Sequence, residues 1–389
     1  MQTSHLDDIL DALKDRSRNV YGPSETTIMG NYIEAVKALG IPHTIRHNKK
    51  GHPFIEMHRE DGSRLAYIHT RLLPSCSKTS SAICNDKVAT HDLLEPKGVR
   101  IPRSRVYREN EAEKALAESY ADNSEVVIKA HSLTLGVGVF LNVRKESFIE
   151  TFAECIAIQK SYGHDPVAIV QEMVPGFEIR AVVIEGRLDN AVIRIPAYVT
   201  GDGESTIDAL IDAKNAERSK CGFFHDKPIR RNRNMHAQLS GAGLSLDSVP
   251  AEGENVLLTS ISNSTYGGET AIVTDLVSDE FKEMAVRAVA AIPGMATGGV
   301  DVMVDSFGST DPVVLEVNAY PFAHLSIYPT FGEGTNPLIH FLEAFLARDK
   351  VTHDPGALLT TKEQRYLVDY MRFYAMRDEM TVKVMAAQS

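Results

Sequence analysis

The sequence predicts an α+β protein of two or three packed lobes. With 389 residues, the chain is longer than one ordinary hydrophobic core can serve. Short runs of strand-forming residues fold back as hairpins at residues 125–143, 178–195 and 300–318. Segments in which apolar residues recur at spacings of three and four lie between these hairpins and predict helices. Antiparallel strand pairs accompanied by helices are typical of the α+β class.

The first 80 residues are predicted to form an N-terminal α/β lobe that shapes the choice of substrate. Its two helices and three strands are expected at residues 4–18, 24–39, 44–47, 54–58 and 65–68. Ser24 is expected to cap the second helix. A polar stretch of small residues at 75–81 marks the end of the lobe. The lobe has no Gly-x-Gly-x-x-Gly turn, so we expect no dinucleotide site there.

Two further lobes are predicted at residues 81–195 and 196–348, followed by a helical tail at 349–389. Their helices are expected at residues 86–97, 111–119, 147–162, 207–218, 279–291, 337–347 and 361–380. Outside the final hairpin, their strands are expected at 105–107, 125–129, 139–143, 167–174, 178–184 and 187–195. The last helix has apolar residues at spacings of three and four, so we expect it to cover a core or a neighbouring subunit.

Composition restricts the partners of the chain. It is 43% hydrophobic and 24% charged, with a net charge of -11, which argues against a nucleic-acid partner. No apolar run has the length of a membrane span, and the first residues lack the pattern of a signal peptide, so a cytoplasmic location is expected. The four cysteines show no zinc-type spacing and are interpreted as buried or idle thiols.

Carboxylates and an amide line one face of the hairpin at residues 300–318. Apolar and polar side chains alternate along both strands, so one face is apolar and the other carries Asp301, Glu316 and Asn318. An antiparallel register places Asp301 opposite Glu316, with side-chain roots roughly 5 Å apart. Two carboxylates so close need a cation between them, and hard oxygen ligands favour Mg²⁺ or Mn²⁺ over zinc. The hairpin therefore predicts a divalent-metal site.

A phosphate site is predicted at the hairpin of residues 125–143. Lys129 ends a run of β-branched residues, and Gly136 and Gly138 in the following turn let backbone N–H groups approach an anion closely. Lys87, at the start of a helix, is a candidate for a second positive charge on the same polyphosphate. Alone, each of these residues also fits an ordinary solvated lysine or an ordinary turn.

Residues 171–178 form a strand that stops at a Pro-Gly linker and then resumes. Backbone groups left free at such an interruption can hydrogen-bond the flat edge of a ligand such as adenine. Glu178, just beyond, is suited to accept hydrogen bonds from a sugar diol. The alternative interpretation is an ordinary crossover between two lobes.

Two arginines lie among apolar residues on consecutive strands. Arg180 and Arg194 leave the sheet on the side opposite its apolar face, and buried guanidinium groups need anions. They either pair with acids such as Glu185 or Asp301, or they hold a substrate carboxylate or a transferring phosphoryl group. The sequence leaves both possibilities open.

The order of these motifs resembles the ATP-grasp superfamily of carboxylate–amine ligases. The likeness covers residues 80–345, about two thirds of the chain, and is strongest to cyanophycin synthetase and the fused glutathione synthetases. It is carried by Lys87, Val126-Val-Ile-Lys129, Glu172-Met-Val-Pro-Gly-Phe-Glu178-Ile-Arg180, Arg194-Ile-Pro-Ala-Tyr-Val-Thr-Gly-Asp-Gly203, Lys214-Asn215, Gly299-Val-Asp301 and Glu316-Val-Asn-Ala-Tyr-Pro321. The resemblance implies an ATP-grasp fold in which two α+β lobes clamp ATP.

The same resemblance implies a role for each candidate residue. Lys87 and Lys129 would bind the phosphates, the backbone of Glu172, Met173 and Val174 would bind adenine, and Glu178 would bind ribose. Asp301, Glu316 and Asn318 would hold magnesium. Arg194 and Arg180 would face the phosphoryl group, and Lys214 and Asn215 would line the acceptor side. ATP and Mg²⁺ are thus the expected cofactors, with Mn²⁺ as a substitute metal.

The implied reaction joins a small-molecule carboxylate to an amine. The carboxylate would attack the γ-phosphorus of ATP, and the amine would then expel phosphate from the acyl phosphate. The amine could belong to the same molecule, which would give a lactam, and His324, Tyr328 or a nearby acid could take its proton. A kinase acting on a hydroxyl and a nucleotide-binding regulatory module are the alternatives. The expected assembly is a homodimer.

Overall fold

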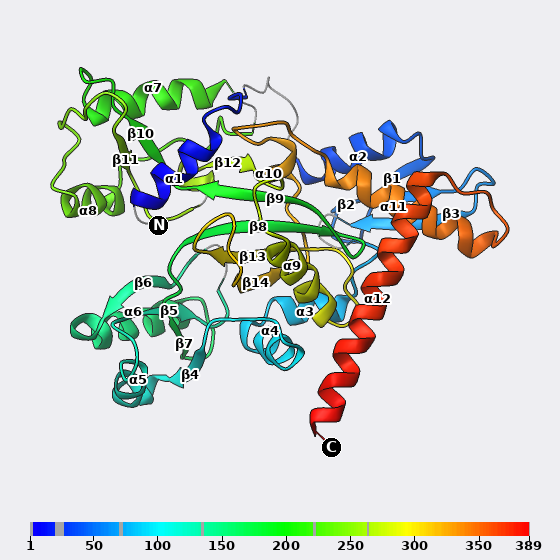
Figure 1. Cartoon of the computed structure of the whole chain (residues 1–389), viewed down its shortest axis with the longest axis horizontal. Helices are drawn as coiled ribbons and strands as arrows, with labels where there is room; N and C mark the ends of the chain where they lie inside the picture. Colours follow the sequence, from blue (N-terminus) through cyan, green and yellow to red (C-terminus); the bar gives the residue numbers. More distant parts are fainter. Residues whose placement is uncertain are drawn as a thin grey trace.

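A five-stranded antiparallel sheet forms the centre of the protein. The computed structural model describes residues 3–19, 27–69, 73–133, 136–220, 223–262 and 264–388. The strands of the central sheet, in spatial order, are β12 (Glu269–Ile272), β9 (Arg187–Ile195), β8 (Phe177–Ile184), β13 (Gly298–Val304) and β14 (Val313–Asn318). Figure 1 shows β8 and β9 crossing the middle of the molecule as a long hairpin.

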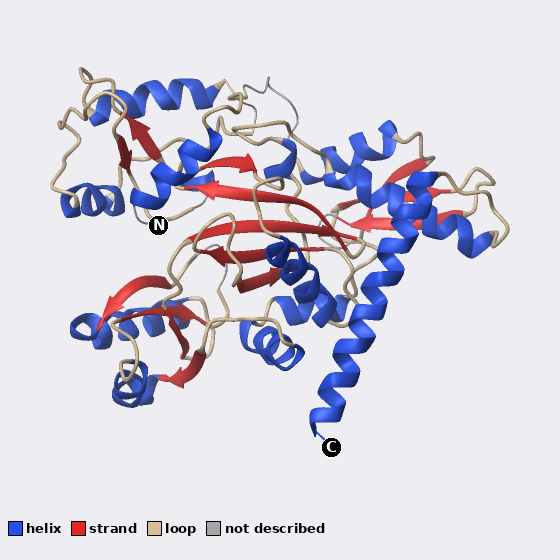
Figure 2. Cartoon of the chain, viewed as in Figure 1, coloured by secondary structure: helices blue, strands red, loops and turns tan. Residues whose placement is uncertain are grey.

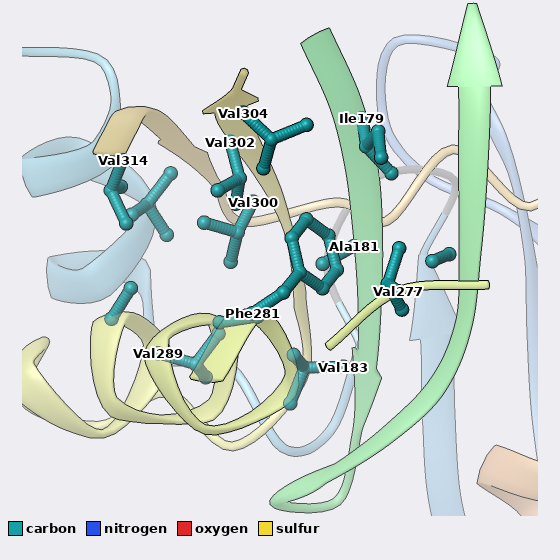
Figure 3. Close-up of a cluster of buried hydrophobic side chains, with 14 of the residues drawn as sticks. Ile179, Ala181, Val183, Val277, Phe281, Val289, Val300, Val302, Val304 and Val314 are labelled. Atoms are coloured by element: carbon teal, nitrogen blue, oxygen red, sulfur yellow. The ribbon is translucent and has the colours of Figure 1, made fainter. Parts of the chain in front are cut away.

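One face of this sheet is apolar and is covered by helix α9 (Asp279–Ala291). Ser278 caps the helix by accepting a hydrogen bond from the backbone N–H of Phe281. Phe281 and Val289 pack on the valines of β13 and on Ile179 of β8 (Figure 3). Since side chains alternate along a strand, the polar residues of the same strands face the opposite side.

A second sheet lies on the polar side, in the lobe drawn in blue-green at the lower left of Figure 1. Its strands, in spatial order, are β4 (Ser104–Arg108), β7 (Val167–Glu172), β5 (Glu125–Ala130) and β6 (Val139–Arg144). Helices α5 (Ala112–Ser119) and α6 (Phe148–Ser161) pack on one face of this sheet. Helices α3 (Lys78–Cys84), α4 (Lys87–Leu94) and η1 (Glu95–Lys97) lead into this sheet, and the short helices η2 (Glu109–Glu111) and η3 (Lys145–Ser147) precede α5 and α6 within the lobe.

The N-terminal lobe is a three-stranded antiparallel sheet, β1 (His43–His47), β2 (Pro53–His58) and β3 (Arg64–His69). It shares a hydrophobic core with α2 (Ile28–Ala38) and α11 (Pro337–His353). In contrast, α1 (Thr3–Leu13) packs into the core of the central sheet, beside β11 (Asn255–Leu257). The chain ends in α12 (Thr361–Gln388), drawn in red, which runs past α11 and α9.

A small subdomain joins the edge of the central sheet (upper left of Figures 1 and 2). It contains the two-stranded sheet of β10 (Tyr198–Thr200) and β11, with helices α7 (Ile207–Ser219) and α8 (Arg233–Gly241). Two short helices, η4 (Ser264–Tyr266) and α10 (His324–Ile327), complete the described elements. Within the described residues no helix is both long enough and apolar enough to cross a membrane.

The predicted α+β class is confirmed, and most predicted elements are present within one or two residues of their expected limits. The first helix ends at Leu13 instead of residue 18, and the second begins at Ile28, where Thr27 supplies the cap. Ser24, the predicted cap, lies outside the described residues. The polar stretch at 75–81 is partly helical, because it runs into α3. The predicted lobe boundaries at residues 80, 195 and 348 stay a prediction.

Candidate active site

The polar face of the central sheet brings acids and arginines from four strands together. In the observed register Asp301 of β13 lies opposite Glu316 of β14 on one side and opposite Arg180 of β8 on the other. Arg194 is on β9, two residues from Val192, which pairs with Arg180. The predicted pairing of Asp301 with Glu316 is therefore confirmed, and the sheet adds the two arginines to it.

Asp301 is held by two guanidinium groups. Arg180 contacts both of its carboxylate oxygens, with Nη2 2.9 Å from Oδ2, and Arg194 Nη2 lies 3.1 Å from Oδ1. Burial alone would raise the pKa of Asp301, but the charges of Arg180 and Arg194 outweigh it and hold the pKa below its usual value. Glu185 pairs with Arg348 instead. Arg180 and Arg194 thus pair with Asp301, one of the two acids that the sequence offered as partners.

Both arginines keep capacity for a further anion. Arg180 Nη1 and Arg194 Nε are buried without a hydrogen-bond partner within the described part of the chain. Arg194 also forms an ion pair with Glu178, at the start of β8. Buried guanidinium nitrogens are costly when unpaired, so these two N–H groups are suited to receive an anionic ligand.

The close approach of Arg180 requires a glycine on the neighbouring strand. A Cβ at Gly299 would lie 2.7 Å from Arg180 Nη1. On the other side, the guanidinium carbon lies 5.9 Å from the ring centroid of Phe322, a cation–π contact. Phe322 has a φ of 55°, in the left-handed region that only a small fraction of non-glycine residues adopt. The motif resemblance contained Gly299, but it did not point to Phe322.

Glu316 and its neighbours fit a magnesium ion. Among the described residues the half-buried Glu316 carboxylate forms no hydrogen bond or ion pair, although Asp301 lies opposite it. Burial and the charge of Asp301 raise the pKa of Glu316. The amide of Asn318 lies next to Asp301, with Nδ2 3.4 Å from Oδ2. A carboxylate without a partner beside a second carboxylate and an amide oxygen is a donor set that Mg²⁺ accepts.

Lys129 and Lys87 reach this site from the second sheet and its connecting helix. Lys129 is on β5, and it interacts electrostatically with Glu316, Lys87 and Asp301. Burial lowers the pKa of Lys129 to about 8, and its ammonium group forms no hydrogen bond within the described ranges. Lys87, the first residue of α4, donates from Nζ to the carbonyl of Leu133 at 2.8 Å. Two cations, one from β5 and one from α4, thus lie near the two acids.

Both glycines of the turn at residues 136–138 have a left-handed backbone, and the role of this turn in binding phosphate stays a prediction. Gly136 and Gly138 have φ values of 78° and 68°, in the left-handed region. Gly138 also packs closely, since a Cβ there would lie 2.7 Å from Cβ of Ala130. Residues 134 and 135 of the turn lie outside the described residues. The contact of Lys87 with Leu133 connects this turn to α4.

The interrupted strand at residues 172–177 leaves backbone groups free. β7 ends at Glu172 and β8 begins at Phe177, and the backbone of Met173 and Val174 forms no backbone hydrogen bond within the described part of the chain. The side chain of Glu172 turns to Arg103, whose backbone N–H and Nε donate to it at 2.9 and 2.6 Å. The two free residues are therefore the ones that suit the edge of a base.

Lys214 and Asn215 lie apart from this cluster, on α7. Lys214 Nζ donates to the carbonyl of Tyr198 at 2.8 Å and pairs with Glu269 at 3.3 Å. Burial lowers the pKa of Lys214 to about 8. The Asn215 side chain exchanges two hydrogen bonds with the backbone of Ile229, at 2.8 and 3.0 Å. Within the described residues neither side chain forms a hydrogen bond or ion pair with Asp301, so their place on the acceptor side stays a prediction.

Glu269 and Arg18 are charged residues that the sequence did not single out. Glu269 is fully buried; burial opposes its ionisation, yet Lys214 and Arg18 together hold its pKa at about 2. Arg18 and Lys214 line a cavity of about 340 Å³ together with Tyr198. The sequence pattern gave little indication of either residue. Glu269 lies on the short strand β12, which periodicity did not reveal, and Arg18 lies in a loop.

Comparison with known proteins identifies the family. The model of the ATP-grasp domain family matches residues 84–323, more than half of the chain. The glutathione biosynthesis bifunctional protein GshAB of Enterococcus faecalis is 31% identical over 262 residues, which cover 65% of this chain and 34% of that protein. The protein of the same name from Listeria innocua is 31% identical over 280 residues, covering 68% and 35%. The chain thus spans about a third of the length of these relatives.

A solved structure agrees with this likeness. The crystal structure of a bifunctional glutathione synthetase from Pasteurella multocida aligns with a TM-score of 0.61 and 25% identity, over 82% of this chain and 43% of that one. The two lysines, the paired carboxylates and the free backbone at residues 173 and 174 all fall within the matched residues 84–323. The chain belongs to the ATP-grasp domain family.

Proposed function

We propose that this protein is an ATP-dependent carboxylate–amine ligase that forms an amide or peptide bond through an acyl phosphate. One observation carries the proposal: Asp301 and Glu316 on the central sheet face Lys129 and Lys87 from the second lobe. Phosphoryl transfer requires acids that can bind magnesium and cations that can bind phosphate, placed opposite one another. The relatives are named for glutathione biosynthesis, which supports an amino acid or a small peptide as substrate.

ATP and Mg²⁺ are the cofactors of this scheme, and Mn²⁺ satisfies the same ligand preference. The backbone of Met173 and Val174 would bind adenine beside Glu172, and Glu178 would bind ribose. Lys87, Lys129 and the turn at Gly136 and Gly138 would bind the phosphates. Asp301, Glu316 and Asn318 would hold the metal, which when bound offsets the charge on the phosphate oxygens.

In the first step, an oxygen of the substrate carboxylate forms a bond to the γ-phosphorus, and the bond from that phosphorus to the oxygen of ADP breaks. Charge grows on the oxygens of the transferring group, where Arg180 Nη1 and Arg194 Nε have unpaired N–H groups. In the second step, the amine nitrogen attacks the acyl carbon, and phosphate leaves with its bonding electrons. A base takes the proton from the amine; His324 and Tyr328 are candidates because they lie at the two ends of α10, the next element after β14 in the chain.

The test is a screen of amino acids in pairs, read by phosphate release and by mass spectrometry of the products. Each active acid is then supplied with hydroxylamine in place of the amine. A ligase that works through an acyl phosphate yields the hydroxamate, whereas a kinase yields a phosphate ester and no hydroxamate. An acid that releases phosphate without an added amine would indicate lactam formation. AMP and pyrophosphate as products would contradict the scheme, and ATP turnover independent of every acid would contradict the ligase.

We also infer a cytoplasmic protein that acts as a homodimer.

A further inference from the structure

Helix α12 carries two apolar stripes on opposite faces. The inner stripe packs on the body of the protein through Tyr366, Phe373 and Met380, which are only 7%, 1% and 3% exposed. These residues recur every seven positions, which keeps them on one side of the helix. Arg377 fixes the same side by donating hydrogen bonds to the carbonyls of Ala290 at 2.9 Å and Ile292 at 3.1 Å.

The outer stripe faces away from the body. Its apolar members recur at alternating spacings of three and four and are exposed in the structure: Val368, Met371, Ala375, Val382 and Met385. The exposed fractions of Met371, Val382 and Met385 are 62%, 63% and 65%. Asp378 occupies the one remaining position of the pattern. This heptad spacing is that of a coiled-coil seam, and it lies opposite the inner stripe.

We propose that the outer stripe of α12 binds the same stripe of a second copy of this chain, as an antiparallel two-helix coil. The stripe runs from residue 368 to residue 385, about 26 Å of helix. In an antiparallel seam the layers are Val368 with Met385 of the partner subunit, Met371 with Val382 of the partner subunit, and Ala375 with Asp378 of the partner subunit. Every outer residue then has one partner, and the pairing is symmetric.

The charges beside the stripe favour a second copy in this orientation. Arg372 and Glu379 are exposed and occupy equivalent flanking positions, seven residues apart. In the antiparallel register, Arg372 lies between the same two layers as Glu379 of the partner subunit, so the pair forms twice. A parallel register would place Asp378 directly against Asp378 of the partner subunit, two like charges in the seam, and would leave Arg372 beside Leu367 of the partner subunit.

The experiment measures assembly of the full chain by sedimentation velocity over a range of concentrations. Wild type is expected to dimerise, and Val382→Glu is expected to raise the dissociation constant at least tenfold. Ala387→Glu makes the same chemical change on the side of the helix away from the stripe and should leave the dissociation constant unchanged. Thermal unfolding of both variants checks that the fold is intact. A wild-type protein that stays monomeric, or a Val382→Glu variant that dimerises as wild type does, would overturn the proposal.

Two further sets of variants test the register. Arg372→Glu should weaken the dimer, and Arg372→Glu with Glu379→Arg should restore it. Under mild oxidation, a chain carrying both Met371→Cys and Val382→Cys should form a covalent dimer, and wild type is the control for the native cysteines. Each single cysteine variant should not, because an antiparallel seam separates identical residues here by about 16 Å, beyond the reach of a disulfide. Efficient crosslinking of the single variants would show a parallel pair and overturn the proposal.

Discussion

Glu316→Gln is expected to raise the stability of the metal-free protein and to abolish most of its turnover. The substitution removes a charge and little volume from a half-buried position opposite Asp301. Two carboxylates about 5 Å apart repel by about 3 kcal/mol at an effective dielectric constant of about 20. Arg180 and Arg194 offset much of this by neutralising Asp301, so about 1 kcal/mol of repulsion remains for the variant to relieve.

The gain in stability on Glu316→Gln follows from the pKa of Glu316, which burial and the charge of Asp301 raise above its usual value. A carboxyl group whose pKa is raised by folding costs free energy above that pKa, where it is charged, and none below the pKa of the unfolded chain. At neutral pH in EDTA, the melting temperature of Glu316→Gln should therefore exceed that of wild type by about 1–2 °C. The difference should disappear as the pH falls through the raised pKa towards its value in the unfolded chain.

Activity should change in the opposite direction. Loss of one charged ligand from the metal site is expected to lower kcat by a factor of about 10² to 10³. It should also reduce the additional thermal stabilisation that Mg²⁺ with ATP gives to wild type. Glu113→Gln, at an exposed position on α5, is the matched control and should change neither quantity. A Glu316→Gln enzyme with wild-type turnover and the same Mg²⁺ dependence would refute the assignment of the metal site.

Lys129→Met is expected to raise the dissociation constant of ATP at least tenfold, with little effect on binding of the acid substrate. In wild type, ATP binding should weaken as the pH rises through about 8, because Lys129 loses its proton there. Calorimetric titration at several pH values checks both expectations. Arg194→Gln should lower kcat about 10²-fold and change ATP affinity little in steady-state kinetics, because we propose that the Arg194 guanidinium group stabilises the phosphoryl group during transfer. A large loss of ATP affinity instead would contradict that role. Asn215→Ala should lower the free energy of unfolding in urea by about 1–3 kcal/mol by leaving the backbone of Ile229 unpaired, and Asn215→Asp, which keeps one of the two hydrogen bonds, should lose less.

Local pattern in the sequence was sufficient to predict the hairpin that carries Asp301 and Glu316. Alternation along residues 300–304 and 316–318 indicates that Asp301, Glu316 and Asn318 share a face, and the hairpin register places Asp301 opposite Glu316. A register shift beyond Asp301 breaks the alternation nearer the turn, which the sequence pattern did not reveal. The same kind of local information located Lys129 at the end of a strand and the free backbone at residues 173 and 174. These features depend on neighbours within about 20 residues, which short motifs and periodicity describe well.

Only the tertiary structure decided what surrounds that hairpin. Arg180 and Asp301 are 121 residues apart in the chain, and they meet because β8 lies beside β13, an order that periodicity does not encode. Likewise, the partners of Lys214 and Asn215 come from strand β12 and from the loop at Ile229. The sequence by itself determined which side chains share a face, since this follows from backbone geometry. The packing of distant elements determined which faces meet, because burial of apolar surface depends on the whole chain.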